Sequence, residues 1–178
     1  VSLASVILFA YAFALPFWSR LKGRSFDATR ITGLILVASM LAILHVILSL
    51  IILDPGYFKK LYAIKRFNLL GEVTLLLGAL AAFVMLARFI GSIEIQGLGK
   101  MINQKSAPWI NGIFALLVMG HLFVMGGLMY SHKYYTIWPG GWIKPHIWPG
   151  MMPPISLLAF LALAAFIGIA LYATLKRK

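Results

Sequence analysis

Cysteine is absent from the 178 residues of this chain, and carboxylates are scarce, with four Asp and Glu against sixteen Lys and Arg. The missing thiols exclude disulfides, thiolate metal sites and iron–sulfur ligation. Charged residues make up only 11% of the chain and hydrophobic residues 62%, whereas a water-soluble domain carries about 25% charged residues. Lipid is therefore the expected solvent, and the length leaves no room for a separate soluble catalytic domain.

A formal charge of +12 would raise the question of nucleic acid in a soluble protein. Here the basic residues lie between apolar stretches, so lipid headgroups and membrane topology explain them. We therefore expect the lipid bilayer as a partner and no nucleic acid.

Five apolar stretches follow one another along the chain. They cover residues 1–17, 31–53, 68–90, 108–130 and 153–175. All but the first have the roughly 20 residues that cross a hydrocarbon core about 30 Å thick. The first could be a signal peptide, but Trp18 and Arg20 mark an interface without a small-residue cleavage pattern. The sequence thus predicts an all-α integral membrane protein, a single domain over residues 1–178 with a bundle of about five transmembrane helices.

Lysine and arginine are unevenly divided between the two sides that alternate loops reach. Ten lie on one side, namely Arg20, Lys22, Arg24, Arg30, Arg88, Lys100, Lys105, Lys176, Arg177 and Lys178. Six lie on the other, namely Lys59, Lys60, Lys65, Arg66, Lys133 and Lys144. Because cytoplasmic loops carry the positive excess, we predict a multi-pass protein of the cell membrane with its N-terminus outside and its C-terminus in the cytoplasm.

The longest outer segment, residues 131–152, contains Ile-Trp-Pro-Gly twice, at 137–140 and 147–150. Proline and glycine disfavour a helix there, and tryptophan prefers the headgroup region. The segment holds Trp138, Trp142 and Trp148. We expect an aromatic cap on the membrane surface, and the alternative is a docking face for a partner or a lid over a quinone pocket.

Two of the four histidines, His45 and His121, fall inside predicted spans, where ionisable residues are costly and usually functional. The second and fourth helices run in the same direction under this topology. His45 lies 14 residues after Ile31 and His121 lies 13 after Pro108, so at about 1.5 Å per residue both are roughly 20 Å from the inner boundary. Equal depth on two helices is what a haem with two imidazole ligands requires.

The surroundings of the two histidines fit such a ring. Gly120, with Gly126 and Gly127 beyond it, would let a macrocycle approach the backbone closely. Basic side chains on the outer side would neutralise propionates, and they are Lys59, Lys60, Lys65, Arg66 and His132. Structural histidines bonded to a neighbouring helix, or ligands of copper or another metal, are the alternatives. Two methionines, Met119 and Met125, flank His121. A methionine thioether can be a ligand of haem iron or copper, but more commonly it fills space in a helical core.

Glu72 is the only carboxylate inside a predicted span, one turn into the third helix and near the level of the histidines. It could relay a proton to a quinone, although an ion pair with Arg66 or Lys65 is the favoured interpretation. Asp54-Pro55-Gly56 is a turn signal.

Two segments resemble the ferric-reductase-like membrane cytochromes, which include the haem subunit of the methionine sulfoxide reductase system. Residues 30–50 resemble their first ligand helix, with Arg30, Gly33 and the Leu44-His45 pair in the family's positions. Residues 99–123, which contain His121, are similar to their later ligand helix.

This chain departs from the family at one ligand position. The family has a further ligand histidine about a dozen residues before the later one, where this chain has Pro108 and Trp109. The resemblance therefore implies at most one b-type haem. It also implies a membrane anchor that passes electrons between a quinone or partner subunit and a redox protein.

The function expected from these observations is electron transfer by a b-type cytochrome subunit with one haem between His45 and His121. No catalytic triad, phosphate-binding loop or pair of close carboxylates supports a hydrolase or transferase, so the chain is expected to be a non-catalytic subunit of an oxidoreductase complex. The alternatives are a cofactor-free accessory or assembly subunit of a larger respiratory complex, and a small transporter or copper-handling protein.

Overall fold

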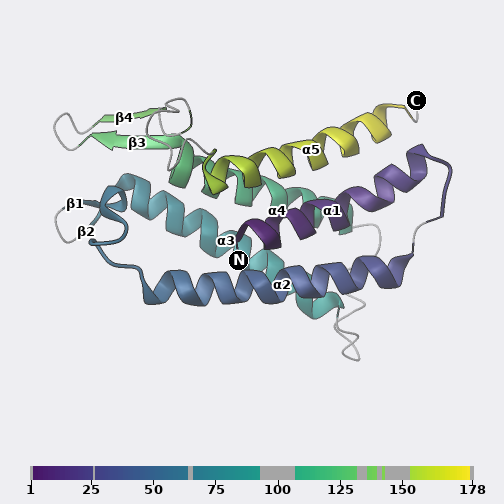
Figure 1. The fold of residues 1–178 in the computed structure, drawn as a ribbon, viewed down its shortest axis with the longest axis horizontal. Coiled ribbons are helices and arrows are strands. Elements are labelled where there is room, and N and C mark those ends of the chain that lie inside the picture. Colours follow the sequence, from purple (N-terminus) through teal and green to yellow (C-terminus); the bar gives the residue numbers. More distant parts are fainter. Residues whose placement is uncertain are drawn as a thin grey trace.

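Five long helices make up most of the chain in the computed structural model, which describes residues 2–25, 27–63, 66–92, 107–131, 136–139, 142 and 153–176 (Figure 1). They are α1 (Ser2–Leu21), α2 (Ala28–Ile51), α3 (Leu69–Ser92), α4 (Ala107–Leu122) and α5 (Ile155–Leu175). All five are long and apolar enough to cross a membrane, α4 together with the turn that follows it. The predicted all-α membrane bundle of about five helices is therefore confirmed.

Each helix packs most extensively against two others, so the bundle closes into a ring in the order α1, α2, α3, α4, α5 and back to α1. Consecutive helices run in opposite directions, and α2 and α4 therefore run in the same direction (Figure 1). The short strands gather at the end of the bundle where α2 and α4 finish. The C-terminal ends of α1 and α5 lie together at the other end (Figure 1).

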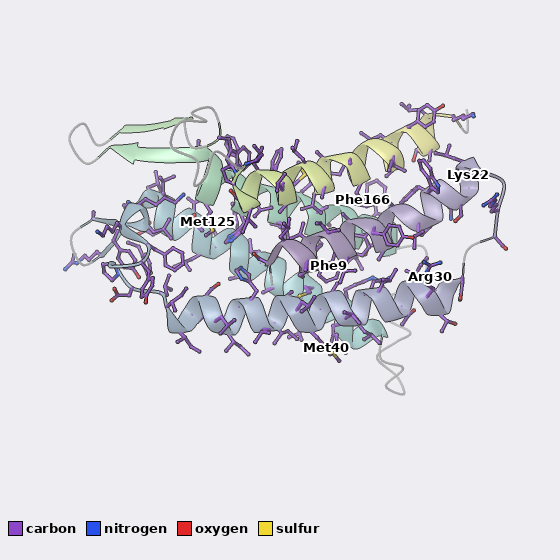
Figure 2. All side chains as sticks on the ribbon, in the orientation of Figure 1. Phe9, Lys22, Arg30, Met40, Met125 and Phe166 are labelled. Atoms are coloured by element: carbon purple, nitrogen blue, oxygen red, sulfur yellow. The ribbon has the colours of Figure 1, made fainter. Side chains whose placement is uncertain are left out.

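Four phenylalanine side chains form the centre of the bundle. The ring centroid of Phe9 in α1 is 4.9 Å from that of Phe114 in α4, and the ring of Phe13 is 5.6 Å from that of Phe166 in α5. Figure 2 shows Phe9 and Phe166 inside the bundle and Met40 pointing away from it. Large apolar side chains such as Met40 are exposed because their partner in the membrane is lipid.

Helix α1 continues through Pro16 to Leu21, past the predicted end at residue 17. Proline removes one backbone donor, a loss that membrane helices tolerate because neighbouring groups compensate for it. At the end of the helix the Lys22 ammonium lies 4.7 Å from the Trp18 ring centroid, and the Arg20 guanidinium lies 6.0 Å from that of Phe17. Pairs of this kind are typical of helix ends at a membrane interface, where the sequence analysis places Trp18 and Arg20.

The predicted helix over residues 108–130 is wrong at its C-terminal end. Helix α4 gives way to a π-helical turn, η2 (Phe123–Gly127), and strand β3 (Leu128–Ser131) follows. The Gly126-Gly127 pair accounts for the break, since glycine loses the most conformational freedom in a helix. Strand β3 pairs antiparallel with β4 (Thr136–Pro139), with Met129 opposite Trp138.

The connection between α2 and α3 begins with the predicted turn. The Gly56 amide donates to the Asp54 carboxylate over 2.6 Å, and the Tyr57 amide donates to the Asp54 carbonyl. A 3₁₀ turn, η1 (Lys59–Leu61), and a hairpin of β1 (Tyr62–Ala63) and β2 (Arg66–Phe67) then lead into α3. At the other end of α2, Asp27 caps the helix by accepting from the Thr29 and Arg30 amides.

Asn68 ties this connection to the start of α3. Its side-chain oxygen accepts from the Gly71 amide over 3.0 Å, as a helix N-cap does. Its side-chain nitrogen donates to the Lys60 carbonyl over 2.7 Å. The side chain is buried, so both bonds are shielded from water, and they position the first turns of α3.

We predict that Asn68→Ala destabilises the protein by about 1–3 kcal/mol, because the cap is lost and buried polar groups lose their partner. Thermal denaturation in detergent, followed by circular dichroism, measures the change. Asn68→Asp is the matched control, because it keeps the acceptor for Gly71 and loses only the donor to Lys60; its midpoint should fall between the other two. An alanine variant as stable as the parent would contradict the role assigned to Asn68.

Candidate functional site

His121 is the penultimate residue of α4 and lies against α3. Its Nδ1 is 2.8 Å from the Thr74 carbonyl oxygen of α3. A Cβ atom added at Gly78 would lie 3.0 Å from Nδ1 and 3.1 Å from Cε1 of the same imidazole. The ring therefore packs closely on the helix backbone at Gly78, where an added side chain would press against it.

The bond to Thr74 determines the tautomer of His121. A carbonyl can only accept, so Nδ1 must carry the hydrogen, and in the neutral imidazole Nε2 keeps its lone pair. Among the residues that the structure describes, no hydrogen bond reaches Nε2. Metal-binding histidines characteristically donate their second ring N–H to a backbone carbonyl or carboxylate in this way.

His45 lies within the last two turns of α2, half-buried, with its Nδ1 3.4 Å from Ser49 Oγ one turn further on. The two sequence-predicted ligands come from separate helices that run in the same direction, and both lie near the end of the bundle where the strands gather (Figure 1). Their Nδ1 atoms have hydrogen-bond partners, and both Nε2 atoms lack one among the described residues.

The glycine beside the imidazole is Gly78, which the sequence analysis missed. The predicted contact glycine, Gly120, has Leu77 of α3 as its neighbour, since a Cβ there would be 3.3 Å from Leu77 Cδ1. The sequence does contain a signal for Gly78, because Thr74 and Gly78 are small residues four positions apart, a spacing typical of close helix contacts.

Gly126 and Gly127, the two glycines beyond His121, face an aromatic residue. An added Cβ at Gly126 would meet the Ser156 side chain first and would lie 2.8 Å from Trp142 Nε1. At Gly127 it would lie 2.9 Å from Phe123 Cδ2 and 3.3 Å from Trp142 Cε3. The Trp142 indole also donates to Ser156 Oγ over 3.1 Å. Trp142 therefore ties the outer segment to the start of α5, next to the π-helical turn that follows His121, and such turns are frequent at functional sites. Trp148 and the repeat at 147–150 lie outside the described residues.

Glu72 is exposed in the first turn of α3, where a carboxylate is favourable beside the helix N-terminus. It forms no ion pair with Arg66, which is itself exposed on β2. Its other expected partner, Lys65, lies outside the described residues. The role of Glu72 as a proton relay stays a prediction.

The basic residues expected beside the propionates differ in their surroundings. Lys59 is exposed, whereas Lys60 is half-buried, and burial lowers the pKa of its ammonium group. His132 and His146 lie outside the described residues. Met119 packs against the central phenylalanine cluster, in keeping with a role as core packing, and Met125 lies near the strand end of the bundle (Figure 2).

A second polar contact between spans lies further along α3, towards its C-terminal end. Arg88 Nε donates to the Asn111 side-chain oxygen of α4 over 3.2 Å. The sequence analysis assigned Arg88 only to the inner loop and did not identify this contact.

The described residues contain no group of three His, Cys, Asp or Glu side chains that could hold a metal ion. A haem iron needs only two axial side chains, because the porphyrin supplies its other four ligands. Two histidines are therefore too few for a typical bare metal site, whereas haem needs no third side chain from the protein. In comparisons with protein-family models, curated protein sequences and solved structures, no match to this chain was found.

Proposed function

We propose that this chain is a b-type cytochrome membrane subunit that holds one haem between His45 and His121. The observation that carries the proposal is the 2.8 Å bond from His121 Nδ1 to the Thr74 carbonyl, which presents Nε2 as a ligand. The second imidazole, on a parallel helix at the same end of the bundle, supplies the opposite ligand. The resemblance of residues 30–50 and 99–123 to ferric-reductase-like cytochromes supports the same assignment.

Bound haem would supply one-electron transfer between ferric and ferrous iron. The protein would supply the two imidazoles, an apolar surrounding and a fixed orientation of the His121 ring. Arg66 and Lys59, exposed on the connection beyond α2, would be available to neutralise propionates. Glu72, exposed at the start of α3, would be the proton relay if a quinone docks at this end.

In this proposal the end of the bundle that holds the histidines faces the outside of the cell membrane. The N-terminus then lies outside and the C-terminus in the cytoplasm, in line with the positive-inside rule. The subunit would take electrons from a quinone or from a partner subunit of a larger respiratory or reductase complex and pass them to an acceptor protein. It has no chemistry of its own beyond this transfer.

The test is a dithionite-reduced minus oxidised visible spectrum of the detergent-purified chain expressed with haem supplied. We expect the α-band of a b-type haem, with the low-spin ferric signal of two imidazole ligands in electron paramagnetic resonance. A well-folded sample with a featureless spectrum would reject the proposal.

The second candidate is a cofactor-free accessory subunit. The hydrogen bond from His121 to the Thr74 carbonyl supports this candidate as well, because it joins α4 to α3 and would stabilise the bundle without a cofactor. In that case haem would not bind, and replacing His45 would leave both the fold and the activity of the complex intact.

A further inference from the structure

A partly open hollow of about 450 Å³ lies between the C-terminal ends of α1 and α5. It lies at the opposite end from the histidines, where the purple and yellow helix ends meet (Figure 1). Its lining is Phe17, Arg20, Leu21, Ala173, Thr174 and Lys176. The haem proposal makes no use of this hollow.

The lining carries two positive charges and no carboxylate. Arg20 and Lys176 come from different helices, and both side chains are exposed to whatever fills the hollow. Within the described part of the chain neither has an ion pair. The Thr174 hydroxyl already donates to the Ala170 carbonyl over 2.7 Å, so the cationic groups are the free donors. Such a lining selects an anion.

The hollow also lies at the depth of lipid headgroups. Trp18 and Lys22, stacked together on the last turns of α1, mark the membrane interface. The rest of the lining, Phe17, Leu21 and Ala173, is apolar. A soluble anion would gain nothing from contact with these apolar side chains. A phospholipid can bind both parts of the lining, because its phosphate would contact the cations and its acyl chains the apolar side chains.

We propose that the hollow between α1 and α5 binds the headgroup phosphate of an anionic phospholipid, held by Arg20 and Lys176. Basic pockets between transmembrane helices on the cytoplasmic side are known to bind such headgroups. The bound lipid would join the ends of α1 and α5 and neutralise charge at this side of the bundle. This inference is independent of haem binding.

Native mass spectrometry of the detergent-purified chain with phosphatidylglycerol or phosphatidylcholine tests the proposal. The double variant Arg20→Gln/Lys176→Gln should bind phosphatidylglycerol on the order of tenfold more weakly than the parent, since each cation near the surface adds to the attraction. Phosphatidylcholine binding should be the same in both proteins. The charge-keeping double variant Arg20→Lys/Lys176→Arg should retain the parent's binding, which separates loss of charge from loss of fold.

The matched control is Lys22→Gln/Arg24→Gln, which removes two charges from the same end of the bundle without touching the lining. Its affinity for phosphatidylglycerol should stay within about twofold of the parent. Equal losses in the two glutamine variants would overturn the proposal in favour of general attraction to charge. Displacement of the lipid by millimolar inorganic phosphate would overturn it in favour of a soluble anion.

Discussion

Replacing His121 by alanine should abolish the α-band of bound haem and leave the purified chain without the low-spin ferric signal. Of the two proposed ligands, His121 is the better supported, because the Thr74 carbonyl fixes its tautomer and the close contact with Gly78 fixes the orientation of its ring. With one imidazole gone, the iron would be five-coordinate and high-spin or the haem would dissociate. His45→Ala should give the same result, and difference spectra together with the haem-to-protein ratio measure both.

A histidine elsewhere in the chain provides the control for this experiment. His146→Ala changes the same residue type in the segment between α4 and α5, and this variant should keep the full spectrum. A parent spectrum that survives in His45→Ala or in His121→Ala would reject the proposed pair. Bands that vanish in His146→Ala instead would place a ligand outside the membrane spans.

Gly78→Leu is expected to have the second largest effect, a loss of haem affinity of about 10–100-fold, the usual range for groups that orient a metal ligand. A Cβ at Gly78 already lies 3.0 Å from His121 Nδ1, so a leucine there must displace the imidazole and break its bond to Thr74. Gly78→Ala needs a shift of only a few tenths of an ångström and should weaken binding less. Haem titration of the apoprotein, followed by absorbance, measures the affinities.

Gly168→Leu is the matched control, because it places the same side chain in the middle of a transmembrane helix where an added Cβ meets nothing within 4 Å. That variant should bind haem as the parent does. If Gly78→Leu binds haem equally well, His121 is not oriented by α3 as the structure indicates. If it only lowers the thermal midpoint of a chain that binds no haem, the accessory-subunit interpretation is correct.

Features that depend on local chemistry were predictable from the sequence. The thickness of the hydrocarbon core sets the length of each span, so all five helices were predicted, and apart from the end of α4 their ends differ by a few residues from the observed ones. The alternation of spans makes α2 and α4 parallel, and counting along them places His45 and His121 at the same end. The turn at Asp54 also follows from its residues, because Asp, Pro and Gly each favour that backbone.

The ends of α1 and α4 were decided by competition between local and tertiary effects. Pro16 would end a helix in water, yet α1 continues to Leu21, where Trp18 and Lys22 stack. Hydropathy continues through Gly127 into Leu128 and Met129, yet the chain becomes a strand there and pairs with β4. Hydropathy measures the preference for lipid and carries no information about which backbone hydrogen bonds are available.

What the sequence by itself determined is therefore the solvent of this protein, its five spans and the alternating direction of those spans. Only the tertiary structure decided which faces of the helices meet. These helices are apolar on all sides, so no amphipathic stripe indicates how each is rotated about its axis. That rotation turns Gly78 and the Thr74 carbonyl towards His121, joins Arg88 to Asn111, and brings Arg20 and Lys176 together around one hollow. The physical reason is that helix packing in lipid depends on side-chain shape and a few polar contacts, which act between residues far apart in the chain.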